Sequence, residues 1–189
     1  MKTLAEINTY WVEHCTCELR QTATQAVLGD GNPQADVVFI GEAPGKNEDI
    51  GGKPFIGAAG KFLSEMLESI KMKREDIYIT NVVKYRPPNN RDPLPSEKEA
   101  CRKWLAEELQ SISPKLVVFL GRHALNSFFP KEKISEVHGK LLKKEVKGFP
   151  TTYFLPLYHP AAALYNGGLR AQLLKDFKQI RTALKNNQK

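Results

Sequence analysis

Apolar and polar positions along the chain form two alternating kinds of block. Short runs rich in β-branched and aromatic residues predict buried strands. These strands are expected at residues 37–43, 76–84, 114–121 and 151–160. Segments with apolar residues on one helical face predict helices. These helices are expected at about residues 3–20, 58–71, 96–112, 122–129 and 168–185. Strands that alternate with helices indicate an α/β fold in which a parallel sheet lies between helical layers.

Two shorter features complete the predicted elements. Residues 29–36, GDGNPQAD, are expected to form a turn. Ser96 follows a proline-rich loop and is expected to cap the helix that begins there.

Polar residues follow the predicted strands at their carboxyl ends. They occupy positions 42–45, 80–81, 121–123 and 159–160. Ligands of parallel α/β sheets bind at this edge. Three of these four strand ends carry side chains suited to base recognition or acid–base chemistry. The sequence therefore predicts a binding site built from several strand ends.

The segment after the first strand, GEAPGKNEDIGGKPFIGAAGKFL (residues 41–63), is rich in glycine. A phosphate-binding P-loop requires G-x-x-x-x-G-K-[ST]. Here Gly60 and Lys61 are followed by Phe62, and Phe55 occupies the position of the first glycine. The dinucleotide fingerprint G-x-G-x-x-G is also missing after this strand. An ordinary connection between strand and helix remains an alternative, but the connecting loop is long for that role.

Composition narrows the class of protein. The chain has 189 residues, 41% of them apolar, which fits one domain over residues 1–189 with a frayed end at about 185–189. The net charge of +7 favours a polyanionic partner such as nucleic acid, although a merely soluble basic protein is an alternative. No membrane span or secretory signal is expected. Three cysteines suggest a reducing compartment, and therefore a cytoplasmic location.

Four motifs together resemble the family 4 uracil-DNA glycosylases, in order and spacing. They are GEAPGKNEDIGGKPFIGAAGKFL, TNVVKYRPPNNRDPLPSE, PKLVVFLGRHAL and HPAAALYNGGLR. The resemblance covers about residues 10–180. It implies a three-layer α/β/α sandwich with a four-stranded parallel sheet. It also implies an enzyme that hydrolyses the N-glycosidic bond of uracil in DNA. We expect this enzyme to be monofunctional, to act on single- and double-stranded DNA, and to be a monomer. The abasic site it leaves would begin base excision repair.

The resemblance assigns roles to residues around a base extruded from DNA. Phe55 matches the aromatic side chain that stacks on uracil. Asn81 matches the amide that pairs with the uracil edge, and His159 matches the donor to uracil O2. Gly41 and Ala43 are placed among the substrate-binding positions.

Glu42 and Glu48 match acidic positions that family members need for catalysis. Which of the two orients water stays open, and Glu42 is favoured because it directly follows the strand. Glu42 could instead cap the glycine loop, Asn81 could simply end a strand, and His159 could be a structural turn residue. The other histidines are expected to be surface or structural residues: His14, His123 and His138.

DNA contacts are expected at the same edge of the sheet. Leu164 and Tyr165 lie where the family inserts a wedge into DNA. Lys61, Arg86 and Arg170 are expected to contact phosphates.

The chain departs from the family at the positions of a [4Fe–4S] cluster. The matching residues are His14, Cys17, Tyr85 and Cys101, where cluster sites normally have four cysteines. Cys15 neighbours the first position but gives a different spacing. We therefore expect no cluster, no other metal and no organic cofactor.

Two alternative functions remain open. One is a glycosylase with a broader range of deaminated bases, and the other is a catalytically weak DNA-binding relative.

Overall fold

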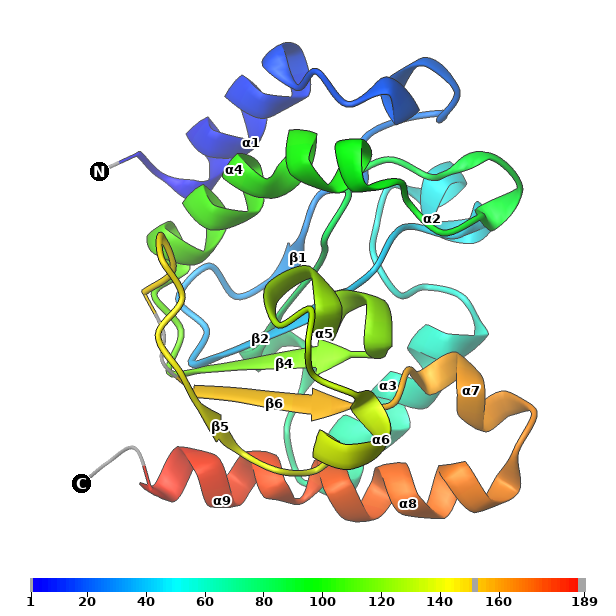
Figure 1. Ribbon diagram of the computed structural model, residues 1–189, viewed down its shortest axis with the longest axis vertical. Helices are drawn as coiled ribbons and strands as arrows, with labels where there is room; N and C mark the ends of the chain where they lie inside the picture. The colour runs from blue at the N-terminus through cyan, green and yellow to red at the C-terminus, as the bar shows by residue number, and fades with distance from the viewer. Residues whose placement is uncertain (1, 151–152, 187–189) are drawn as a thin grey trace.

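The computed structural model describes residues 2–150 and 153–186 (Figure 1). A six-stranded sheet runs through the molecule in the order β1-β3-β2-β4-β6-β5. Its four central strands are parallel to one another. They are β2 (Val37–Gly41), β3 (Tyr78–Asn81), β4 (Leu116–Leu120) and β6 (Tyr153–Leu157). The predicted four-stranded parallel sheet is confirmed, with each strand shorter than its apolar run. Residues 151–152, where the fourth strand was expected to begin, lie outside the described residues.

Two short antiparallel strands extend the sheet beyond the prediction. They are β1 (Asp30–Gly31), which pairs with β3, and β5 (Leu142–Lys143), which pairs with β6. Residues 30–31 fall within the segment predicted as a turn. A strand of two residues has no measurable alternation, so the hydrophobic pattern could not reveal either one.

Helices cover both faces of the sheet, as the three-layer fold requires. On one face lie α1 (Leu4–His14), α4 (Pro95–Ile112) and α5 (Arg122–Phe128). On the other lie α3 (Ala58–Ser69), α8 (Gly167–Phe177) and α9 (Gln179–Asn186). Figure 1 shows α4 above the sheet and the α8–α9 pair below it.

Alternation within the strands builds the two hydrophobic cores. In β2, Val38 and Ile40 pack with Trp104 of α4, whereas Phe39 packs with Leu63 of α3. Successive strand residues point to opposite faces. Because both faces are covered by helices, all five residues of β2 are buried and the strand appears in the sequence as a continuous apolar run.

Several helix boundaries differ from the sequence prediction. The first helix ends at His14 and is followed by a separate 3-10 helix, Glu18–Gln21. The predicted cap Ser96 is wrong: α4 begins at Pro95, with Leu94 as the capping residue. The Glu97 carboxylate accepts the Leu94 N–H at 2.7 Å, so a side chain inside the first turn satisfies the exposed backbone donor.

Other short helices lie in segments where the sequence predicted no helix. They are α2 (Lys46–Gly51), α6 (Ile134–Val137), α7 (Pro160–Leu164) and the 3-10 helices Arg74–Asp76 and Pro88–Asn90. The single helix expected over 168–185 is divided into α8 and α9. α9 continues to Asn186, into the expected frayed tail, while 187–189 lie outside the described residues. In the described part of the chain, no helix has both the length and the apolar character needed to cross a membrane.

Candidate active site

A cavity of about 390 Å³ lies at the carboxyl ends of the parallel strands. Six residues predicted to form the site line it: Glu42, Ala43, Glu48, Phe55, Asn81 and His159. They come from the β2–α2 loop, α2, the loop before α3, the end of β3 and the β6–α7 junction. The fold therefore brings together residues that are distant in sequence, at the edge where parallel α/β sheets bind ligands.

Asn81 presents an unpaired acceptor to this cavity. Its side chain is buried, and within the described residues its Oδ1 has no hydrogen-bond partner. Buried polar atoms in folded proteins are nearly always paired, so an unpaired one indicates a ligand or a functional role. Its backbone carbonyl, in contrast, accepts a hydrogen bond from Lys84 Nζ at 3.0 Å. A purely structural strand end would leave no such side-chain acceptor unused.

Gly41 allows the Asn81 amide and the Phe55 ring to lie against β2 in the wall of the cavity. It is paired in register with Asn81 across β2 and β3. A Cβ at position 41 would overlap Asn81 Oδ1 and lie 2.8 Å from the Phe55 ring. Glycine is therefore required at this position for close approach of the amide and the ring.

Phe55 is held in a strained backbone conformation. Its φ of 53° is in the left-handed region, which is uncommon for a bulky side chain. Arg74 fixes this segment, since its Nη1 donates to the Phe55 carbonyl at 3.0 Å. The Phe55 ring lies 5.7 Å from the His159 ring, between centroids, and is tilted 31° to it. Such strain is characteristic of ligand-binding positions.

The two acidic residues have different surroundings. Glu48 Oε1 accepts the backbone N–H groups of Ile56 and Gly57 at 3.1 and 2.9 Å. It therefore holds together the loop that carries Phe55 and the start of α3. The capping role considered for Glu42 belongs instead to Glu48. Glu42 Oε1 is buried and has no hydrogen-bond partner among the described residues.

Burial raises the pKa of Glu42 to about 7. Asp92 also raises this pKa, whereas Lys98 and Arg122 lower it. A carboxyl group with a pKa near neutrality exchanges a proton readily at physiological pH, which suits acid–base chemistry.

His159 is a neutral donor. Its Nδ1 accepts the Ala161 backbone N–H at 3.1 Å and caps α7. The proton of the neutral ring is therefore on Nε2. Burial lowers the pKa of His159 to about 4, so the ring stays uncharged at neutral pH. His159 is a turn residue, as one alternative proposed, yet its Nε2–H remains available to a ligand.

Sequence reasoning missed several residues near the cavity. Pro87 and Asn90 line it. His123, expected to be a surface or structural residue, lies with its Nδ1 3.4 Å from Glu42 Oε1. Its place directly after β4 was the one signal in the sequence, because all the strand ends meet at this edge.

The residues expected to contact DNA lie on the surface. Leu164 ends α7 and Tyr165 follows it, 92% exposed. Lys61 is exposed on α3. Arg86 Nε donates to Asn90 Oδ1 at 2.7 Å. Arg170 pairs with Glu65, and its guanidinium lies 4.3 Å above the Phe62 ring.

The positions matching a cluster site offer a poor ligand set. His14 is exposed, and its Nδ1 contacts the Tyr10 carbonyl at 2.7 Å. The Tyr85 side chain is buried against Trp104. Cys101 is in side-chain contact with both Cys15 and Cys17, and all three thiols are buried and free of disulfides. Even with Cys15 in place of His14, three thiols and a phenol do not supply the four thiolates of a usual [4Fe–4S] site.

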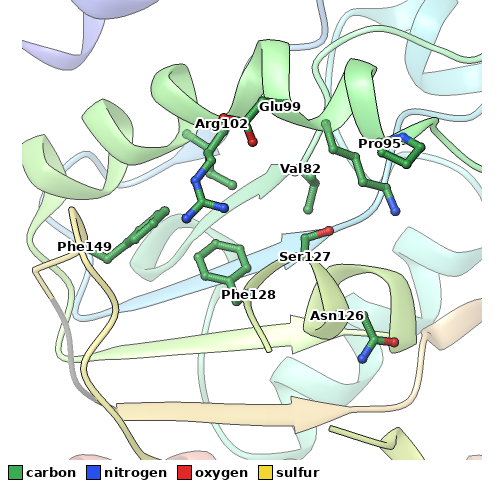
Figure 2. A pocket seen from close by; sticks show the side chains of 10 residues that line it. Val82, Pro95, Glu99, Arg102, Asn126, Ser127, Phe128 and Phe149 are labelled. Atoms are coloured by element: carbon green, nitrogen blue, oxygen red, sulfur yellow. The ribbon is translucent and has the colours of Figure 1, made fainter. Parts of the chain in front are cut away.

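A second groove, of about 240 Å³, lies between α4, α5 and Phe149 (Figure 2). Phe128 and Phe149 are among its apolar residues, and Arg102 points toward them. None of the predicted site residues lines this groove, so the candidate active site is the cavity at the strand ends.

This fold and site define a class of protein, and comparison with known proteins agrees. The model of the Uracil DNA glycosylase superfamily matches residues 28–185, and the chain belongs to this superfamily. Within it, the chain is similar to type-4 uracil-DNA glycosylases. The enzyme of Archaeoglobus fulgidus is 49% identical over 169 residues, which are 87% of this chain and 84% of the relative. That of Saccharolobus solfataricus is 47% identical over 89% of this chain and 80% of the relative. That of Thermotoga maritima is 39% identical over 96% of this chain and 95% of the relative.

Proposed function

We propose that this chain is a monofunctional uracil-DNA glycosylase. It hydrolyses the N-glycosidic bond of uracil in DNA and leaves an abasic site, the first step of base excision repair. The observation that carries this proposal is the unpaired Asn81 Oδ1 in a cavity that also holds Phe55 and His159. Similarity to type-4 enzymes over most of the chain supports the same activity.

Recognition of the base follows from the side chains of the cavity. Asn81 Oδ1 accepts the uracil N3–H, and its amide N–H donates to O4. Phe55 offers its ring face to the extruded base. Gly41 and Ala43 form the adjacent wall and allow close approach of the base.

Bond cleavage separates charge, and two residues respond to it. As the bond between C1′ and N1 breaks, its electron pair moves to the base, leaving a uracil anion and an oxocarbenium-like sugar. The Nε2–H of His159 donates to uracil O2 and stabilises the anion. The Glu42 carboxylate stabilises the cation and orients the attacking water. Glu48 acts indirectly by holding the Phe55 loop.

DNA reaches the cavity only after the nucleotide has left the helix. Leu164 and Tyr165 are exposed at the end of α7, the helix that His159 caps, and can fill the space that the base leaves. Lys61, Arg86 and Arg170 contact phosphates of single- or double-stranded DNA. We propose that the protein acts as a monomer, as a single domain over residues 1–189. The free thiols fit the reducing cytoplasm.

We also propose that catalysis needs no cofactor and that the protein holds no [4Fe–4S] cluster. The ligand set of His14, Cys17, Tyr85 and Cys101 supports this proposal, because two of the four residues are not thiols. Iron analysis after anaerobic purification tests it. About four iron atoms per chain, with broad visible absorption, would contradict it.

The activity is tested with an oligonucleotide that contains one uracil, followed by alkaline cleavage at abasic sites. Strand cleavage at the uracil position is expected, while a matched thymine oligonucleotide stays intact. An uncleaved uracil strand at stoichiometric excess of protein would overturn the proposal, and retained binding would then identify a DNA-binding relative. A parallel hypoxanthine oligonucleotide tests the broader substrate range.

A further inference from the structure

Glu42 Oε1 is a buried carboxylate oxygen without a hydrogen-bond partner among the described residues. Such an atom in a folded protein requires an explanation. His123 lies within ion-pair distance of it, with Nδ1 3.4 Å from Oε1. The His123 side chain is 28% exposed and that of Glu42 is 22% exposed. The contact is therefore shielded from water on most sides.

The second ring nitrogen of His123, Nε2, also has neighbours. It accepts a hydrogen bond from Arg122 Nε at 3.1 Å and lies 3.3 Å from Asp92 Oδ2. Burial lowers the pKa of His123, so the ring is neutral at physiological pH. A neutral imidazole has one N–H. The Arg122 contact uses the lone pair of Nε2 and favours the tautomer whose proton is on Nδ1, facing Glu42, whereas a proton on Nε2 would face Asp92 Oδ2.

We propose that His123 is a positioning residue for Glu42. Its Nδ1–H donates to Glu42 Oε1, favours the ionised form of this carboxyl group, and leaves Oε2 for the sugar and the attacking water. The proposal rests on the glycosylase function proposed above. Hydrogen bonds of catalytic groups are often long in the free enzyme and shorten when substrate binds, which fits the 3.4 Å separation.

The charges around this pair determine the direction of the pH effect. The groups that face it from the loop before α4, from α4, from α5 and from the cavity are Asp92, Lys98, Arg122, Glu48 and His159. Glu42 acts as a carboxylate, which forms above its pKa of about 7. Excision by the wild-type protein should therefore increase as the pH rises through this value. Removal of the His123 donor raises the pKa of the Glu42 carboxyl group further, so the increase in excision rate should occur at higher pH.

The experiment measures single-turnover excision of uracil at subsaturating protein, from about pH 5.5 to 9.5. Under this condition the pH profile reports ionisation in the free protein. His123→Ala is expected to move the rise of the excision rate with pH, the acidic limb of the profile, to higher pH by about one pH unit. Below pH 7 this shift lowers the rate about tenfold, and at high pH the rate recovers to that of the wild type. His123→Asn keeps a side-chain N–H and should shift the limb less. His14→Ala removes an exposed histidine on α1 and should reproduce the wild-type profile.

A His123→Ala profile that is lower at every pH but not shifted would overturn the proposal, because a structural role alone predicts that result. Thermal melting confirms that the variant is folded. A second measurement needs neither a variant nor DNA. In the ¹⁵N spectrum of histidine-labelled wild-type protein, His123 should carry its proton on Nδ1, and an Nε2–H tautomer would also overturn the proposal.

The two proposals can fail separately. If the wild-type protein leaves uracil in DNA at every pH, the glycosylase function is wrong. The tautomer measurement still tests whether the Nδ1–H of His123 faces Glu42. If the wild-type protein excises uracil and the limb does not move in His123→Ala, the function stands and the positioning role is wrong.

Discussion

At the scale of single residues, the cavity contains an unpaired amide acceptor, Asn81 Oδ1, and a fixed donor, His159, in addition to the Glu42 carboxylate. Asn81 Oδ1 lacks a partner among the described residues, while His159 uses Nδ1 to cap α7 and keeps Nε2–H for the ligand. Uracil offers N–H and C=O groups along one edge, so these two side chains can contact different parts of that edge. In the proposed mechanism, recognition of uracil and stabilisation of its anion are therefore tasks of different side chains.

His159→Asn tests the donor without removing the helix cap. Asparagine is among the best capping residues and can accept the Ala161 N–H in place of Nδ1. Its shorter side chain does not present a donor where Nε2–H lies. We expect the single-turnover rate to fall by about 10²–10³, with little change in melting temperature. An unchanged rate would show that His159 acts only as a cap.

Gly41→Ala tests the close approach of Gly41, Asn81 and Phe55. The added Cβ overlaps the amide and the ring, so we expect both weaker excision and a loss of about 1–3 kcal/mol in the free energy of unfolding. Gly167→Ala is the matched control, because no atom lies within 4 Å of a Cβ at that position. Denaturant unfolding and single-turnover excision measure the two effects. Equal behaviour of the two variants would contradict the packing argument.

At the scale of elements, a buried polar network holds the end of β3. Lys84 Nζ contacts Thr80 Oγ1, the Asn81 carbonyl and Glu108 Oε2. Glu108 Oε1 accepts from the Tyr78 hydroxyl at 3.2 Å. Lys84 and Glu108 are both fully buried, so each charge depends on the other. Through this network α4 fixes the strand end that carries Asn81.

Lys84→Met is expected to destabilise the protein by about 3–5 kcal/mol, because it leaves the Glu108 carboxylate buried without its partner. The double variant Lys84→Met/Glu108→Leu should recover much of this loss. Lys73→Met removes a lysine from a pair exposed to water, and its stability should match that of the wild type. Urea unfolding compares the three variants. A mild effect of Lys84→Met alone would show that the network contributes little.

At the scale of the whole molecule, net positive charge favours DNA as a partner, and the position of α7 favours one face for it. The net charge is +7, and the parallel strands direct their carboxyl ends toward α2 and α7 (Figure 1). Exposed Leu164 and Tyr165 lie at the end of α7. The described C-terminal end of α9 lies on the opposite side of the molecule, away from α7 (Figure 1). Charge near the cavity should therefore contribute more to DNA binding than charge near this end.

Lys61→Ala is expected to weaken DNA binding and to reduce the magnitude of the log–log salt slope by about 0.9. Lys185→Ala makes the same change of charge on the last described turns of α9 and should leave the slope unchanged. Fluorescence anisotropy over a range of salt concentrations measures both. If the two variants have equal slopes, the cavity face is not the one that holds the phosphates.

Local sequence determined much of this protein. Apolar runs located the four parallel strands, and strand–helix alternation defined the layers. The carboxyl ends of parallel strands must meet at one edge, which placed Glu42, Asn81 and His159 together, and the family resemblance added Ala43, Glu48 and Phe55 to the residues that line the cavity. The failures are also local. Two-residue edge strands have no pattern, and the cap of α4 depends on Glu97 reaching back to Leu94.

Only the tertiary structure decided which of these residues interact. Strand register places Gly41 beside Asn81, and the approach of α5 brings His123 against Glu42. The tertiary structure also shows that Glu48, not Glu42, accepts the backbone N–H groups of the Phe55 loop. These contacts join residues far apart in the chain, and they depend on register and helix packing. Hydrophobic periodicity fixes which face of an element is buried, but it does not fix which side chains of two elements meet.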